Sequence, residues 1–164
     1  MTPMVTMEKL QVTTPNDTDL VVTRSFAASR ELLFDCHTKP ELVRRWMLGP
    51  DGWTMPVCEI DLRRGGKFRY VWRKPGAPDL HMSGEFREIA PPSRIVHVER
   101  FDEDWAGGEE AVVTTLFEEK GGRTTMHMTI RFSSKEVREA AMATGMTDGM
   151  NTGYDRLEHI LAGK

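Results

Sequence analysis

The sequence predicts an α+β fold in which one curved sheet of seven antiparallel strands surrounds a long C-terminal helix. Three observations lead to this fold class. Seven β-rich segments follow one another, turns rich in glycine and proline separate most of them, and one long amphipathic stretch occupies the C-terminal end. Sequential strands joined by short links favour antiparallel pairing. A sheet with one apolar face and an amphipathic helix can bury both surfaces by packing together.

The first strand is expected at residues 20–26, whose sequence LVVTRSF is rich in β-branched residues. Two short helices should follow it, at residues 31–36 after a capping Ser29 and at residues 41–47 after Pro40. Six more strands are expected at residues 54–62, 66–72, 80–89, 94–101, 110–118 and 124–132. Several of these alternate apolar and polar residues, as strands with one buried face do.

The C-terminal helix is predicted as one element over residues 134–161, about 42 Å long. A capping box of Ser133 and Glu136 would start it. At 100° per residue, its inward face forms an arc of roughly 120°. The arc contains Met142, Met146, Gly149, Met150, Gly153, Leu157, Ile160 and Leu161. Each glycine inside a helix costs roughly 1 kcal/mol against alanine, so either a closely packed backbone or space for a guest molecule must offset that cost.

Length, charge and cysteine content narrow the classes of protein to consider. A chain of 164 residues is expected to form one domain, here residues 18–164, with residues 1–17 as a flexible leader. The net charge of −3 gives no electrostatic reason to expect a nucleic-acid partner. No apolar span of about 20 residues predicts a membrane helix. Cys36 and Cys58 form no disulfide framework, so a reducing, cytoplasmic setting is expected.

Five stretches of the sequence resemble the START-like (SRPBCC) superfamily, and more narrowly its branch named after the activator of the heat-shock-protein-90 ATPase (AHSA-type). In order they read TRSFAASRELLFDCHTKPELVRRWM, GPDGW, EIDLRRGGKFRYVW, GEFREIAPPSRIVHVERF and GMTDGMNTGYDRLEHIL. The resemblance implies the helix-grip fold, with a cavity between sheet and helix that the superfamily uses for apolar or amphipathic small molecules. Family members commonly carry a tryptophan where this chain has Met150, and often another aromatic residue where it has Met47.

Large aromatic residues and methionines are the candidates for lining such a cavity. They are Trp46, Trp53, Tyr70, Trp72, Met82, Phe86, Phe101, Met146, Met150 and Tyr154. Methionine adapts to irregular space, and ligand pockets combine apolar walls with a few oriented polar groups. The alternative interpretation is an ordinary core packed to crystal-like density.

Polar groups that could enter the cavity are the hydroxyls of Tyr70 and Tyr154, one of Thr114 and Thr115, and the ring of His97. Glu59 and Asp61 precede a turn, and we expect them to be exposed or paired with arginine rather than to act as buried acids. Trp105, within an acidic loop, is interpreted as a lid over the cavity or as a protein contact.

No catalytic residue, metal site or cofactor is predicted. The five histidines show no metal-ligand spacing, no GxSxG elbow is present, and Cys36 is interpreted as a structural thiol. The leading hypothesis is therefore binding of an apolar or amphipathic small molecule. Two alternatives stay open: an enzyme of the cyclase or hydrolase type acting on a cavity-bound substrate, and the chaperone-associated, stress-response role that the family name implies. Self-association into a homodimer also stays open.

Overall fold

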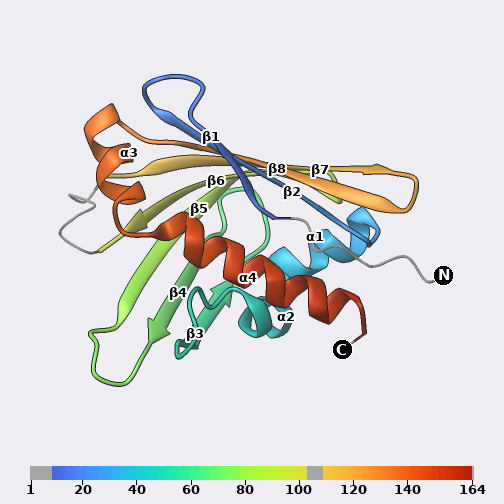
Figure 1. Ribbon diagram of the computed structural model, residues 1–164, viewed down its shortest axis with the longest axis horizontal. Coiled ribbons are helices and arrows are strands. Elements are labelled where there is room, and N and C mark those ends of the chain that lie inside the picture. The colour runs from blue at the N-terminus through green and yellow to red at the C-terminus, as the bar shows by residue number, and fades with distance from the viewer. Residues whose placement is uncertain (1–8, 103–108, 164) are drawn as a thin grey trace.

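The computed structural model describes residues 9–102 and 109–163. One antiparallel sheet of eight strands curves around the C-terminal helix (Figure 1), in the order β1–β2–β8–β7–β6–β5–β4–β3. The strands are β1 Gln11–Thr13, β2 Asp19–Phe26, β3 Thr54–Ile60, β4 Lys67–Arg73, β5 Leu80–Ala90, β6 Arg94–Phe101, β7 Ala111–Lys120 and β8 Arg123–Arg131. The predicted α+β class and antiparallel sheet are therefore confirmed, and the predicted number of strands was one too few.

The additional strand, β1, lies inside the segment that the sequence analysis assigned to a flexible leader. Its three residues pair antiparallel with Val21–Thr23 of β2, and all three are exposed. Next to it, the backbone N–H of Leu10 donates to Asn151 Oδ1 at 2.9 Å. Because the strand is held through its backbone and buries no apolar face, its sequence carries no period-two pattern that could have predicted it. Residues 1–8 of the expected leader lie outside the described residues.

Two short helices follow β2, as predicted: α1 (Arg30–Thr38) and α2 (Pro40–Trp46). The Ser29 side chain accepts a hydrogen bond from the backbone of Leu32 and caps α1, while Pro40 occupies the first turn of α2. The indole Nε1 of Trp46 donates to the carbonyl oxygen of Cys36 at 2.8 Å. This bond ties the end of α2 to α1, and both helices lie close to the C-terminal half of the last helix in Figure 1.

The single long C-terminal helix was a wrong prediction. The chain forms α3 (Lys135–Met142) and α4 (Met146–Leu161), separated by Gly145 with a φ of +81°. A left-handed glycine ends a helix, so α4 alone is about 24 Å long. The apolar periodicity continues through the break because Met142 and Met146 both pack against the core. The capping residue of α3 is Ser134, which accepts from the backbone of Val137, rather than Ser133.

A buried arginine on β2 joins the sheet to α4. The side chain of Arg24 is 0% exposed, and its guanidinium lies 2.9 Å from Asp155 Oδ1 and 3.4 Å from Glu158 Oε2. It also donates to Asn151 Oδ1 at 3.1 Å. A buried charge is strongly destabilising unless it is paired, so these three residues hold α4 at one position above β2.

The two glycines of α4 lie where the helix meets the end of α2 and the loop that follows it. A Cβ atom on Gly153 would lie 3.1 Å from the carbonyl oxygen of Trp46. One on Gly149 would lie 3.3 Å from Cδ of Pro50. Close packing of a neighbouring backbone therefore offsets the propensity cost at Gly153, which was one of the two explanations that the sequence left open.

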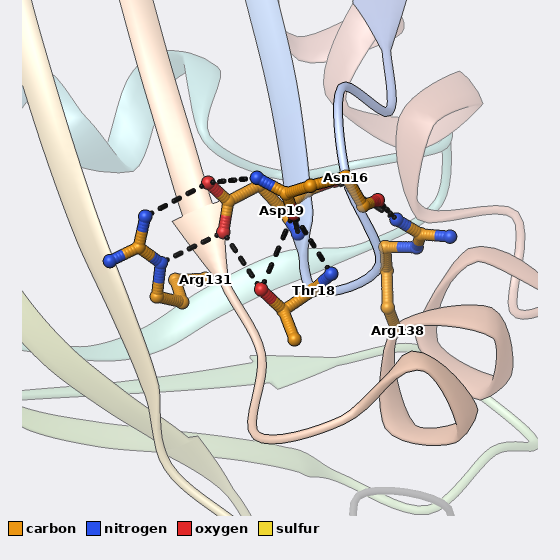
Figure 2. A network of polar contacts seen from close by, with 5 residues as sticks. All are labelled: Asn16, Thr18, Asp19, Arg131 and Arg138. Atoms are coloured by element: carbon orange, nitrogen blue, oxygen red, sulfur yellow. Dashed lines mark hydrogen bonds and ion pairs between the residues drawn. The ribbon is translucent and has the colours of Figure 1, made fainter.

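Helix α3 is attached to the turn between β1 and β2 by a polar network (Figure 2). The Asp19 carboxylate accepts from Arg131 Nε at 2.9 Å and from Nη2 at 3.1 Å. The guanidinium of Arg138 on α3 donates to the backbone carbonyls of Asn16 and Asp19. Hydrogen bonds from Arg131 are the main cause that lowers the pKa of Asp19 to about 2.

We predict that Asp19→Asn lowers the free energy of unfolding by about 1 kcal/mol at pH 7, the upper range for a pair with one exposed partner. The depressed pKa means that the ion pair stabilises the fold above pH 3.8 and that this contribution fades as the pH falls toward 2. Urea unfolding of the unaltered protein and of Asp19→Asn between pH 7 and pH 2 measures the difference in their free energies of unfolding. The exposed neighbour Asp17→Asn is the matched control, and a difference that stays constant with pH would contradict the assignment.

We also predict that Gly153→Leu lowers the melting temperature. Overpacking against Trp46 should cost roughly 1–3 kcal/mol, which exceeds the gain of about 1 kcal/mol in helix propensity. His159→Leu, at an exposed position of the same helix, tests the propensity gain without the clash and should change stability little. A higher melting temperature for Gly153→Leu would show that the close approach is not limiting.

Candidate functional site

A cavity of about 630 Å³ lies between the inner face of the sheet and α4. The structure brings all ten predicted site residues to its wall. They are Trp46 from α2, Trp53 from the loop before β3, Tyr70 and Trp72 from β4, Met82 and Phe86 from β5, Phe101 from β6, and Met146, Met150 and Tyr154 from α4. That these residues bind a ligand remains a prediction.

Strand pairing explains why the sheet residues meet. Tyr70 lies opposite Met82 on the neighbouring strand, and Met82 lies opposite Phe101 on the next one. Residues directly opposite each other in antiparallel strands project from the same face, so the three form one row across β4, β5 and β6. Trp72, two residues after Tyr70, shares that face. Period-two alternation was the signal that predicted this wall.

Two of the three tryptophans of the wall, Trp46 and Trp72, are held by their indole nitrogens. Trp72 Nε1 donates to the carbonyl oxygen of Met47 at 2.8 Å, in addition to the bond from Trp46 to Cys36. The Trp72 ring stacks on Phe101 with centroids 6.1 Å apart, and the Trp46 ring stacks on Tyr154 at 5.1 Å. With their polar atoms already paired, these rings offer apolar surface to the cavity in fixed orientations.

Five methionines line the cavity: Met47, Met82, Met128, Met146 and Met150. All five are only partly buried. An unbranched thioether side chain changes rotamer easily and packs against differently shaped surfaces. The cavity therefore combines rigid aromatic rings with an adaptable thioether surface.

Polar groups enter the cavity at few positions. His97 Nε2 lies 2.8 Å from Glu99 Oε1, and both residues line the cavity. Thr115 lines it too, whereas Thr114 does not. The sequence analysis proposed His97 but missed Glu99, although their spacing of two residues on one strand indicates a shared face.

The two tyrosines of the cavity present protonated hydroxyls. Burial raises the pKa of Tyr70 and of Tyr154 well above the ordinary value of a phenol. Each hydroxyl can therefore donate one hydrogen bond and accept another.

Glu59 and Asp61, which were expected to be exposed or paired with arginine, are exposed.

His37, on α1, also lines the cavity. It was not among the residues predicted from the sequence. Its Nδ1 lies 2.8 Å from the carbonyl oxygen of Leu33 and must donate to it, and its ring packs against Trp46 with centroids 4.9 Å apart. Burial lowers the pKa of His37 to about 4. The ring is therefore neutral near pH 7 and adds no positive charge to the cavity.

Other reactive groups do not converge here. Within residues 9–102 and 109–163, no three His, Cys, Asp or Glu residues are placed to hold a metal ion. Cys36 and Cys58 are free and buried, and burial raises the pKa of Cys58 to about 11, so its thiolate is scarce at neutral pH. Trp105, interpreted as a lid or a protein contact, lies outside the described residues. No helix in the described part of the chain is long and apolar enough to cross a membrane.

A second hollow of about 630 Å³ lies over strands β3 to β6 and is lined mainly by charged residues. Lysine, arginine, glutamate and aspartate all contribute to it. Because the charges have both signs, they create no field that would select one kind of ion. The apolar cavity under α4 is therefore the better candidate for a functional site.

The fold, with its cavity between the sheet and the last helix, is that of a START-like domain. Residues 27–162 match the profile of the family described as "Activator of Hsp90 ATPase homolog 1-like protein". This match covers most of the chain, so the protein belongs to that family. The resemblance that the five sequence stretches indicated is thereby confirmed.

Similar proteins share the fold over nearly the whole chain. A crystal structure of a Rhodobacter sphaeroides protein is 31% identical, with a TM-score of 0.88 over 96% of this chain and 100% of that one. A Mycobacterium smegmatis protein is 21% identical, with a TM-score of 0.82 over 94% and 97% of the two chains, and shows the fold alone. Human activator of 90 kDa heat shock protein ATPase homolog 1 is 31% identical over 109 residues, 66% of this chain but 28% of the human protein.

Proposed function

We propose that this protein binds an apolar or amphipathic small molecule in the cavity between the sheet and α4. The observation that carries the proposal is the convergence of aromatic and methionine side chains from six helices and strands on one space of about 630 Å³. Ligand pockets typically measure about 300–1,000 Å³ and are lined mainly by apolar groups. We further propose a reducing, cytoplasmic setting, because both cysteines are free.

The residues at two positions support a ligand-binding cavity rather than a core filled by the protein's own side chains. Met150 and Met47, where related sequences commonly carry aromatic residues, both line the cavity. A thioether is smaller than an indole and leaves space where a ring would fill it.

We predict that Met150→Trp fills part of the cavity and weakens ligand binding while the fold is kept. Apolar compounds should raise the melting temperature of the unaltered protein, with a stabilisation of about 2.7 kcal/mol at a hundredfold excess over Kd. Differential scanning fluorimetry with a broad apolar library measures both responses. Native mass spectrometry of freshly purified protein would detect a bound molecule directly.

Val112→Trp is the control for this substitution, because Val112 is exposed on β7 and lies away from the cavity. It should leave the response to ligands unchanged. A library in which no compound shifts the melting temperature, together with no co-purified molecule, would contradict ligand binding.

A second candidate function is stimulation of the ATPase of a 90 kDa heat shock protein. It is favoured by similarity to the human and mouse activators of 90 kDa heat shock protein ATPase homolog 1, which are 31% and 29% identical to this chain over 109 residues. The chain spans only 28% of the length of each of these proteins, so the matched region alone would have to supply the effect.

The test is the rate of ATP turnover by a purified 90 kDa heat shock protein from the same source, with and without excess of this chain. If the second candidate function is correct, we expect at least a doubling of the rate, and Gly153→Leu should reduce that effect if docking requires the folded domain. An unchanged rate when the chain is present at saturating concentration would reject this role.

A further inference from the structure

The polar end of the cavity has an unusual charge composition. Among the described residues that line the cavity, Glu99 is the single carboxylate, and neither lysine nor arginine is present. Glu99 pairs with His97 through the contact of 2.8 Å between Oε1 and Nε2. We expect an apolar cavity with one carboxylate and neither lysine nor arginine to bind some head groups of amphipathic molecules more tightly than others.

The strand geometry directs this pair toward the cavity. His97 and Glu99 are two residues apart on β6 and therefore project from the same face. Each side chain is 17% exposed. Glu99 lies opposite Gly84 and Ala111 on the two neighbouring strands, and the ring of Phe68 lies over Gly84. The ring of Phe68 meets the His97 ring edge-on at 5.2 Å and fixes its plane.

The hydrogen bonds of the pair are incomplete. An ionised carboxylate accepts about four hydrogen bonds, whereas the His97 ring provides the single donor that the described residues bring to Glu99. If the neutral imidazole donates through Nε2, its Nδ1 becomes a further acceptor. Buried polar groups are nearly always satisfied by protein, water or ligand. The pair therefore presents several free acceptor positions to whatever occupies the cavity.

We infer that the His97–Glu99 pair binds the head group of the ligand, and that this head group is a hydrogen-bond donor, a hydroxyl or an amine, rather than a carboxylate or phosphate. The inference rests on the proposed function. A hydroxyl or ammonium group supplies the missing donors to Glu99. An anionic head would lie beside the Glu99 carboxylate with neither lysine nor arginine in the described cavity wall to compensate, and burying an unpaired charge is costly. The apolar part of the ligand would lie against the row of Tyr70, Met82 and Phe101.

Three probes with one ring system and different heads test this: 2-naphthol, 2-naphthylmethylamine and 2-naphthoic acid. Their dissociation constants are measured on the unaltered protein by calorimetry at pH 7. We expect the alcohol, the amine or both to bind at least tenfold more tightly than the acid, since hydrogen bonds to charged groups are the stronger class. The better of the two identifies the head group.

The outcomes separate this inference from the function on which it rests. Equal binding of all three probes, or tighter binding of the acid, overturns the inference and leaves small-molecule binding intact. Binding of none of the three counts against both. These measurements need no substitution, so they do not depend on a variant that folds.

Two variants then test whether the His97–Glu99 pair causes the preference for a donor head group. Glu99→Gln keeps the shape of the side chain but removes its charge, and it should reduce the preference for the donor head about tenfold. Glu118→Gln is the matched control, because Glu118 faces His127 at 3.7 Å in an exposed pair away from the cavity. An unchanged preference in Glu99→Gln, or an equal loss in Glu118→Gln, overturns the assignment.

Discussion

The position of α4 above the sheet depends on one buried charge. Arg24 projects from β2 with its side chain entirely removed from solvent, and α4 supplies Asn151, Asp155 and Glu158 to it. Moving the helix away would leave the guanidinium unpaired in a dry environment, which is among the larger single penalties in a protein of this size. Hydrophobic burial alone would allow the helix to slide or rotate, since it has no preferred direction.

Fixing the helix at β2 determines where the cavity forms. On its other side, Gly153 allows α4 to approach the carbonyl of Trp46 closely, and Arg156 donates to the carbonyl of Gly49 at 2.7 Å. The helix is thereby attached at two places, while the curved strands β4 to β6 extend beyond it. The space between them is bounded by rings such as Trp72, whose indole is bound to the backbone of Met47 and cannot simply collapse inward.

The fold is shared among related proteins, whereas the side chains of the cavity bear on function. The same fold recurs in proteins that are 18–31% identical to this chain, and a fold hosts many functions. The cavity of this chain carries thioethers at positions 47 and 150, and one carboxylate paired with one imidazole. If the proposed function is correct, these side chains determine which molecule fits.

The sequence by itself determined the features that depend on local periodicity. Period-two alternation assigned the residues of several strands to faces, which is why aromatic residues of the sheet could be predicted to line one wall. The helical period did the same for Met146 and Met150. Turn residues placed the strand ends, because glycine and proline constrain the backbone locally.

Only the tertiary structure decided the features that depend on partners distant in sequence. Strand β1 is held by backbone pairing to Val21–Thr23, which leaves no trace in side-chain pattern. The break at Gly145 is hidden because apolar residues continue on both sides of it. A charged residue such as Arg24 is expected at the surface, and its burial follows from carboxylates more than 130 residues away on α4. Pairing energies of this kind arise from three-dimensional proximity, which periodicity along one chain segment does not contain.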